Sequence, residues 1–214
     1  RDAVPLLRRV EVGVGPHRVE AQAPHRAIEI GPRGHRLGLR RHGDELLGRD
    51  ATKYLIDELK KTSPAVVEDL IPGQMKLVDV QQVLHHLLRE EISIRPLALI
   101  LEVLGEAAAR LHDPLLLAEF VRARLARAIS ARYRDKDNRL HVVTLDPLVE
   151  ESIRTGVEYT AGSWSVSLPP DVVAELCRRI GEAVQPLASA NREPVVLASP
   201  QIRAALAHLV AGRL

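Results

Sequence analysis

The stretch EDLIPGQMKLVDVQQVLHHLLREEISIRPLALILEVLGE, from Glu68 to Glu106, predicts two amphipathic helices joined by a short extended link. Apolar residues of the first helix recur at i, i+3, i+4, i+7 and i+8, the period of a helix with one buried face. These residues are Val80, Val83, Leu84, Leu87 and Leu88. Ile92-Ser93-Ile94 then alternates apolar and polar residues, which is typical of an extended link. We expect every polar residue of this stretch to be solvated, and none forms a catalytic pattern.

The second helix has an apolar stripe of its own, formed by Leu97, Ile100, Leu101 and Leu104. Pro96 can open this helix at its first position, where the missing N–H costs nothing. The chain therefore contains at least one helical unit with a continuous aliphatic core.

The composition indicates a globular chain with an aliphatic core. Of 214 residues, 46% are hydrophobic and 27% are charged, which are ordinary fractions. Aromatic residues make up only 2%, which favours helix-rich packing and offers few platforms for stacking nucleic-acid bases. The net charge of +2 is too small to imply a polyanionic partner. We therefore expect no nucleic-acid binding.

Two further observations bear on the cellular setting. Cys177 is the only cysteine, so one chain can form neither a disulfide nor a cysteine-based metal site, and a reducing cytosol fits. The longest apolar run, Leu97 to Leu101, is far too short to span a bilayer, and no signal-peptide pattern is visible.

Several sequence blocks carry a family resemblance. VQQVLHHLLREEISIRPLALILEVLGE resembles the signature VLQxLLxExVSIRxLxxILExLxE of the FlhA/InvA family, the export-gate proteins of flagellar and type III secretion systems. Further blocks follow in the family's order: HGDELLGRD (His42 to Asp50), VVEDLIPG (Val66 to Gly73), HVVTLDPLVEESI (His141 to Ile153) and PVVLASPQIRAAL (Pro194 to Leu206). Pro96 departs from the family, which usually has an acidic residue there. The segments ELLGR and DLIPG resemble the flagellar branch more than the type III secretion branch, but they do not decide between these branches.

The resemblance implies a helix-rich α+β fold with two parts. Residues 40–134 correspond to a helical subdomain that builds a ring, and residues 135–214 to a truncated C-terminal α/β subdomain. It also implies a non-enzymatic fragment of the cytoplasmic part of an export gate, on the cytoplasmic side of the bacterial inner membrane, with the membrane-spanning half absent. The implied partners are further copies of the chain, the export ATPase stalk, chaperone–substrate complexes and other export-gate proteins. A freestanding soluble adaptor without catalysis is the alternative.

The signature also supplies the only candidate site residues. They form a possible interface around the predicted link: Arg89, Glu90, Ile92, Ser93, Ile94 and Arg95. We predict no catalytic, cofactor-binding or metal-binding residues and no cofactor.

The first 39 residues differ in kind from the remainder. Up to Thr52 there are ten Arg and no Lys, and Gly and Pro interrupt each short alternating run. The runs Val10-Glu11-Val12, Ala27-Ile28-Glu29-Ile30 and Arg36-Leu37-Gly38-Leu39 permit weak strands. One interpretation is a divergent or poorly packed strand segment. The interpretation we favour is an out-of-frame reading of a GC-rich gene, with little order and little function.

After residue 50 the pattern becomes regular. Helices are predicted to start at Asp50, Ser63-Pro64 and Asp113-Pro114, and residues 134–138 form a charged, turn-rich boundary. Strands are then expected at 140–145, 164–168 and 195–198. Each is followed by a helix that begins with Pro, at Pro147, Pro170 and Pro200. This β-α-β-α-β-α order favours a small α/β layer with some parallel pairing.

Polar side chains offer no reactive constellation. His85 and His86 are adjacent on a helix and point about 100° apart, so they cannot chelate one ion together. His42, His112, His141 and His208 lack a carboxylate or cysteine at ligand spacing, and Glu90-Glu91 and Glu150-Glu151 are interpreted as solvated pairs. The long helix after Pro114 has an arginine face formed by Arg122, Arg124, Arg127 and Arg132. We interpret it as solvated, with an acidic partner as the alternative.

Overall fold

The structure is a computed structural model, and it describes residues 7–13, 26–29, 47–160, 163–211 and 213. These residues fall into two compact units. One contains the described residues from Leu47 to Ala126, and the other joins the two N-terminal strands to the residues from Arg127 onward. We call them the helical unit and the α/β unit. The helix-rich α+β fold expected from the sequence is confirmed.

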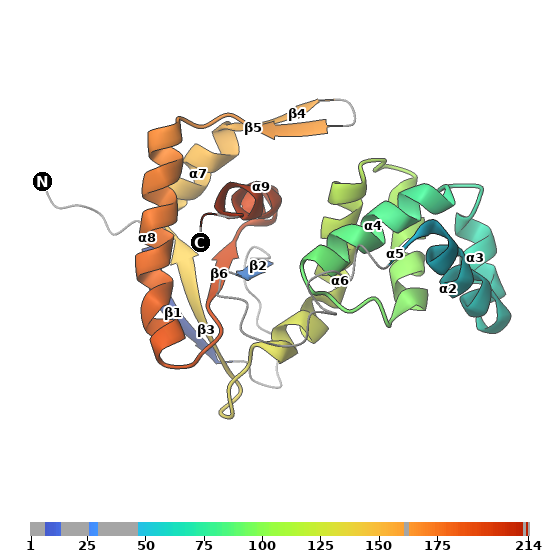
Figure 1. The fold of residues 1–214 in the computed structure, drawn as a ribbon, viewed down its shortest axis with the longest axis horizontal. Helices are drawn as coiled ribbons and strands as arrows, with labels where there is room; N and C mark the ends of the chain where they lie inside the picture. The colour runs from blue at the N-terminus through green and yellow to red at the C-terminus, as the bar shows by residue number, and fades with distance from the viewer. Residues whose placement is uncertain (1–6, 14–25, 30–46, 161–162, 212, 214) are drawn as a thin grey trace, which may run out of the picture. The chain divides into compact units, whose positions relative to one another are not determined.

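The helical unit consists of consecutive helices. They are α2 (Arg49–Thr62), α3 (Pro64–Leu70), α4 (Leu77–Arg89), α5 (Leu97–Ala108) and most of α6 (Pro114–Arg132). The predicted stripes of α4 and α5 are buried: Val80, Val83, Leu84, Leu87, Leu97, Ile100, Leu101 and Leu104. Helix α3 contacts α5, and α2 contacts both α3 and α4 (Figure 1). Local periodicity therefore accounts for the core of this unit.

Two of the predicted helix caps are formed by aspartate. The Oδ1 atom of Asp113 accepts hydrogen bonds from the backbone N–H groups of Leu115 and Leu116, at 2.9 and 3.0 Å. Asp146 accepts one from the backbone N–H of Leu148 at 2.9 Å. Such bonds satisfy donors that the first turn of a helix leaves unpaired. The Ser63 and Ser199 side chains make no capping bond, although a proline follows each of them.

The α/β unit is organised around a four-stranded sheet in the order β1-β3-β6-β2. The strands are β1 (Leu7–Gly13), β2 (Arg26–Glu29), β3 (Arg139–Leu145) and β6 (Val195–Ala198). The central strands β3 and β6 are parallel, with Val143 opposite Val196, which agrees with the expectation of some parallel pairing in this layer. The outer strands are antiparallel to them, with Val10 opposite Val142 and Ile28 opposite Val196.

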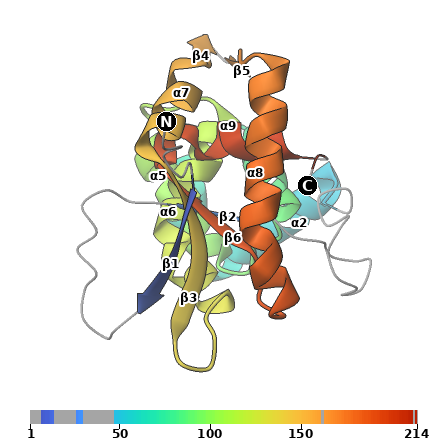
Figure 2. The same cartoon turned by 90° about the vertical axis from the view of Figure 1, so that its left-hand side faces the viewer.

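Three helices cover this sheet: α7 (Pro147–Thr155), α8 (Pro170–Ser189) and α9 (Pro200–Val210). Helix α8 contacts β1 and β3, and α9 contacts β2 (Figures 1 and 2). The core between them includes Val143, Ile153, Ile180, Val196 and Leu206, each at most 1% exposed. The sheet therefore has a packed aliphatic interior without an aromatic centre.

The strand expected at 164–168 does not join this sheet. Strand β5 (Ser163–Val166) pairs with β4 (Val157–Thr160), which the sequence did not predict, in a separate two-stranded sheet. The predicted order of three alternating strands and helices is wrong in this respect. Helix α8 also includes Pro186, near its C-terminal end.

Two of the three alternating runs in the first 39 residues lie in strands. Val10-Glu11-Val12 is part of β1 and Ala27-Ile28-Glu29 is part of β2, whereas the run at 36–39 lies outside the described residues. The remaining interpretation of this segment, as an out-of-frame reading, stays a prediction, as do the subdomain boundaries at 39 and 134. Among the described residues, none of the helices combines the length and apolar character needed to cross a membrane.

Candidate interaction surface

The link between α4 and α5 is fixed by a residue in the left-handed backbone region. Glu91 has φ 54°, the Ile92 N–H donates to the Leu87 carbonyl, and the Glu91 N–H donates to the Leu88 carbonyl, both at 2.9 Å. This is the Schellman arrangement, which usually places glycine at the left-handed position. The sequence indicated only an extended link, because the usual glycine marker is absent.

The six signature residues occupy three levels of exposure. Arg89, Ser93 and Arg95 are exposed, Glu90 and Ile94 are half-buried, and Ile92 is buried. Pro96 is the N-cap residue of α5, one position before the first helical residue Leu97, whereas the sequence predicted Pro96 at the first helical position. Only the exposed residues can contact a partner directly, while Ile92 anchors the link to the core.

Glu90 contacts a buried arginine of α6, Arg122. Arg122 is 7% exposed, forms an ion pair with Glu90, and has its Nε 4.0 Å from the Glu119 carboxylate. The predictions that Glu90 is solvated and that Arg122 belongs to an exposed face are therefore wrong. A signal was present in the sequence, since Arg122 lies four residues after Ala118 and three before Leu125, on the buried side of α6.

The other arginines of that predicted face are exposed. Arg124 pairs with Glu106 at 3.0 Å, and Arg132 lies 5.5 Å from the centre of the Tyr133 ring. Arg127 is also exposed. Exposed pairs of this kind contribute little to stability.

The two adjacent histidines of α4 have separate environments. His85 Nε2 lies 2.8 Å from the Leu47 carbonyl, which also accepts a hydrogen bond from Gln81 at 2.9 Å. The pKa of His86 is lowered, first by burial and then by the charge of Arg89. Both side chains are half-buried. Within the described ranges, no three His, Cys, Asp or Glu side chains gather closely enough to hold a metal ion.

The α/β unit contains a polar cluster around the buried His141 that the sequence did not predict. His141 on β3 is 7% exposed; its Nε2 lies 2.7 Å from Asp135 Oδ2, and its Nδ1 lies 2.8 Å from Arg192 Nη1. The expectation that His141 has no carboxylate nearby is therefore wrong. Alternation along β3 was the available signal, because His141 shares a face with the buried Val143 and Leu145.

This cluster is closed to chemistry on a substrate. Both ring nitrogens of His141 already have a side-chain partner, so a bound molecule could reach neither without displacing Asp135 or Arg192. Cys177 is buried, and desolvation raises the pKa of its thiol, which disfavours the reactive thiolate. Glu150, predicted to be solvated, accepts a hydrogen bond from the Ser199 N–H at 3.0 Å at the start of α9.

Each unit exposes large apolar side chains. Tyr54 and Leu99 are exposed on the helical unit, at 64% and 39%, and Leu148 and Val172 on the α/β unit, at 71% and 41%. Leu148 and Val172 lie in the first turns of α7 and α8. Exposed apolar residues of this size are candidates for partner contacts.

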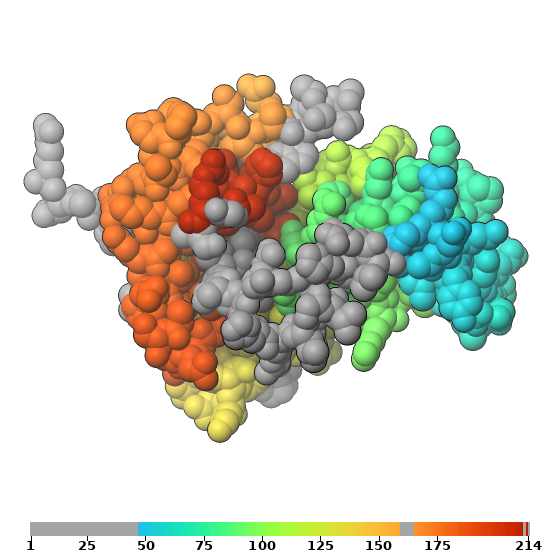
Figure 3. Space-filling model, in the orientation of Figure 1, coloured from blue at the N-terminus to red at the C-terminus, as the bar shows by residue number. Residues whose placement is uncertain are grey.

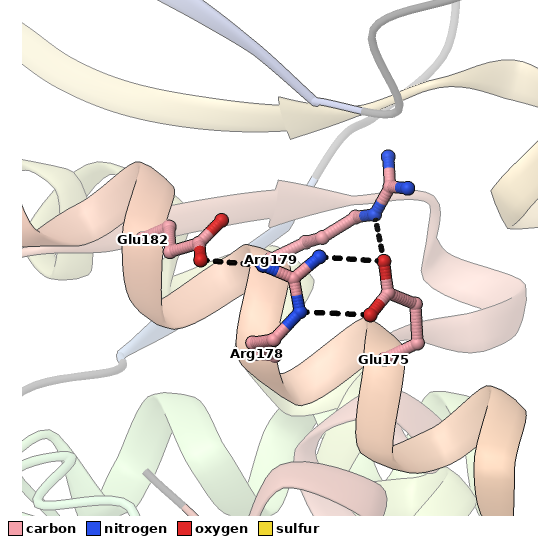
Figure 4. A network of polar contacts seen from close by, with 4 residues as sticks. All are labelled: Glu175, Arg178, Arg179 and Glu182. Atoms are coloured by element: carbon pink, nitrogen blue, oxygen red, sulfur yellow. Dashed lines mark hydrogen bonds and ion pairs between the residues drawn. The ribbon is translucent and has the colours of Figure 1, made fainter. Parts of the chain in front are cut away.

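Further along α8 the exposed face carries charge. The side chain of Glu175 pairs with Arg178 and Arg179, and Arg178 also pairs with Glu182 (Figure 4). The hydrogen bonds from Arg178 hold the pKa of Glu175 at about 2. The space-filling view shows this helix, in orange, at the surface of the α/β unit (Figure 3). Because these charges satisfy one another within one helix, we place the docking candidates at Leu148 and Val172.

Comparison with known proteins gives consistent matches. The model of the FHIPEP family matches residues 36–214. The flagellar biosynthesis protein FlhA of Bacillus subtilis is 36% identical over 165 residues, which cover 77% of this chain and 24% of that protein. The chain thus spans about a quarter of the length of this relative.

Solved structures share the fold. The C-terminal domain of InvA is 29% identical with a TM-score of 0.73, covering 82% of this chain and 53% of that one. A chain from the complex of Chlamydia pneumoniae CdsV and CdsO is 30% identical with a TM-score of 0.61, covering 68% and 42%. Nonameric SctV-C from EPEC has a TM-score of 0.68 over 81% of this chain and 52% of that one; at 23% identity this likeness shows the fold alone.

Proposed function

This chain belongs to the FHIPEP family, and on that premise we propose that it is part of the cytoplasmic domain of a flagellar or type III protein-export gate. In this proposal it binds proteins and catalyses no reaction. Copies assemble into a ring through the helical unit, and the α/β unit receives the stalk of the export ATPase. Chaperone–substrate complexes and other export-gate proteins are further partners, on the cytoplasmic side of the bacterial inner membrane.

One observation carries the docking role. A chain 30% identical to this one was solved in the complex of CdsV and CdsO, and the matched region covers 68% of this chain. The closed environment of His141 supports a role in binding over one in catalysis. The relative SctV-C from EPEC is nonameric, which is consistent with ring assembly as part of the proposal.

Leu148 and Val172 are our candidate contacts for the stalk. Both are large apolar side chains on helices that contribute other apolar residues to the core. Leu148 and Val172 themselves are exposed and do not belong to that core. The exposed Asp171 lies next to Val172 in sequence, whereas Glu151, near Leu148, is already paired with Arg154 on α7. This surface would suit a helical partner with an apolar stripe flanked by basic residues.

A capture experiment tests this assignment. The 214-residue chain and its Leu148→Glu/Val172→Glu variant would be assayed for binding to the purified stalk protein of an export ATPase. We expect the variant to bind about tenfold more weakly or worse, because central apolar contacts dominate such interfaces. Leu99→Glu, the same kind of change on the helical unit, is the matched control and should bind normally. Equal binding by the double variant and the control would overturn the assignment.

The signature link is our candidate ring contact. Ser93 and Arg95 project from a link that Ile92 and the Arg122–Glu90 pair hold in place. We expect Arg95→Glu to lower the fraction of assembled chain in sedimentation velocity, whereas Arg154→Glu on α7 should leave it unchanged. Identical sedimentation of the Arg95 variant and the unmodified chain would exclude this contact.

A further inference from the structure

We infer that His141 is a proton-operated latch that holds the loop after α8 to the first residues of β3. The latch has three parts drawn from separate segments: Asp135 in the turn before β3, His141 within β3, and Arg192 in the loop between α8 and β6. The latch lies within the α/β unit alone and does not depend on the proposed docking role.

The partners of His141 allow only one protonation state of its ring. A carboxylate can only accept a hydrogen bond, so His141 Nε2 must carry a proton and donate it to Asp135. A guanidinium can only donate, so Nδ1 must be bare and accept from Arg192. The ring is therefore neutral, with its hydrogen on Nε2, whenever both contacts are present.

Proton uptake breaks one side of this arrangement. The added proton can bind only at Nδ1, which then becomes a donor facing the donor group of Arg192. The imidazolium and the guanidinium also repel each other, while the bond to Asp135 gains an opposite charge. Protonation therefore releases Arg192 and retains Asp135.

Both sides of the latch are also held by backbone hydrogen bonds. Asp135 Oδ1 accepts hydrogen bonds from the backbone N–H groups of Asp137 and Arg139, each at 2.9 Å. The bond from His141, first, and these backbone bonds lower the pKa of Asp135 to about 2, so its carboxylate stays charged. Arg192 follows the left-handed residue Asn191 at the end of α8, and the backbone N–H groups of Asn191 and Arg192 donate to the Ala188 and Leu187 carbonyls, each at 2.9 Å.

The elements around His141 carry both charged and apolar residues. Glu11 of β1 is its register partner, and the facing strand β6 has the apolar sequence Val195–Ala198. Glu193 beside Arg192 is exposed. The charged residues of α8 pair among themselves on its exposed face: Glu175, Arg178, Arg179 and Glu182. Arg192 is thus the cation placed directly against the imidazole.

Two measurements on the full 214-residue chain test the latch. The first is the ¹⁵N spectrum of the His141 side chain at about pH 8, where unperturbed histidine is neutral. It should show the tautomer with hydrogen on Nε2. A hydrogen on Nδ1 would overturn the inference without the need for any variant.

The second is the amide exchange protection of residues 190–193 at about pH 8 and about pH 5, which lie on either side of ordinary histidine titration. Protection corrected for intrinsic exchange should fall about fivefold or more at the lower pH, because local opening reports the stability of the loop. Amides 52–59 of α2 serve as the internal reference. Equal protection at both pH values would overturn the inference.

Two variants separate the latch from a general effect of acid. His141→Gln offers an amide N–H to Asp135 and an amide oxygen to Arg192 but cannot take up a proton, so its loop should stay protected at about pH 5. Arg192→Ala should leave the loop weakly protected at both pH values. A His141→Gln loop that still responds to pH, or an Arg192→Ala loop as protected as the unmodified one at the higher pH, would contradict the latch. The Arg192→Ala comparison is decisive even if His141→Gln fails to fold.

Discussion

The helical unit and the α/β unit reach their folds in different ways. The helices from α2 to α5 follow one another in sequence, and their main contacts, α2 with α3 and α4 and α3 with α5, join helices at most two places apart in the chain. The central sheet of the α/β unit instead takes strands from residues 7–13, 26–29, 139–145 and 195–198. The first kind of unit can be predicted from periodicity in a short window, whereas the second depends on pairing between distant segments.

The largest effect that would sharpen this contrast is expected from removing residues 1–33. β1 pairs along seven residues of β3, and β2 along all four residues of β6. Without them only two parallel strands remain in the sheet, and a two-stranded pair is marginal. We expect amide exchange in β3 and β6 to become fast while α4 and α5 keep their protection.

The same deletion decides how the N-terminal segment should be interpreted. Unchanged exchange in β3 and β6 would favour the out-of-frame interpretation of residues 1–39, and the α/β unit would then form without them.

Truncating a buried leucine in the helical unit should have the next largest effect, and the loss of stability should be confined to that unit. Leu101 on α5 is completely buried, so Leu101→Ala should cost the helical unit about 2–5 kcal/mol, and Leu84→Ala about the same. Leu99→Ala, on the exposed side of the same helix, should cost about 0.5 kcal/mol or less. Denaturant unfolding followed by residue-resolved exchange measures both. Equal losses in the two units would refute their independence.

Arg122→Ala should cost the helical unit about 3 kcal/mol, because it removes a buried cation from beside the Glu119 carboxylate and breaks the ion pair with Glu90. The matched control is Arg124→Ala, which breaks an exposed pair with Glu106 and should cost about 0–1 kcal/mol. Thermal unfolding of the two variants provides the comparison. Equal destabilisation would show that burial of Arg122 has no energetic consequence.

His86 of the helical unit and the carboxylates of Asp135 and Glu175 should respond to acid in different pH ranges, with the smallest changes of this set. The pKa of His86 is lowered in the folded helical unit, so the unfolded state binds protons more readily and stability falls as pH drops below about 6.5. Asp135 and Glu175 of the α/β unit have pKa values of about 2, so their contribution is present above their unfolded values and is lost as pH falls from about 4 toward 2. Unfolding followed per unit from pH 7 to 2 measures this. His86→Gln should abolish the loss of stability of the helical unit below about pH 6.5. If this loss persists in the variant, the assignment to His86 is contradicted.

The sequence predicted most of the helices because their stripes and Asp-Pro or Ser-Pro starts are local signals. It also predicted β3, β6 and some parallel pairing, which follow from apolar runs separated by crossover helices, but it did not predict which strands would pair. It did not predict β4, whose residues Val157–Thr160 pair with β5. A hairpin outside the main sheet does not change the alternation of strands and helices from which the other strands were predicted.

The polar contacts were predicted less well for a related reason. Arg122 and Glu90 are 32 residues apart, and Arg192 and His141 are 51 apart, so nothing in a local window indicates that they meet. A charged residue on an apolar stripe, such as Arg122 after Ala118, was the only local warning. The exposure of Ser93 and Arg95 could be predicted from alternation, but the left-handed Glu91 could not.

The central claim is that the α/β unit, and not the helical unit, receives the export ATPase stalk. Amide exchange of the 214-residue chain with and without the purified stalk protein tests it most directly, because one experiment compares both units. We predict added protection in the first turns of α7 and α8, around Leu148 and Val172, with α2 to α5 unchanged. Protection confined to α2 to α5, or none in either unit under conditions where the stalk is captured, would contradict the claim.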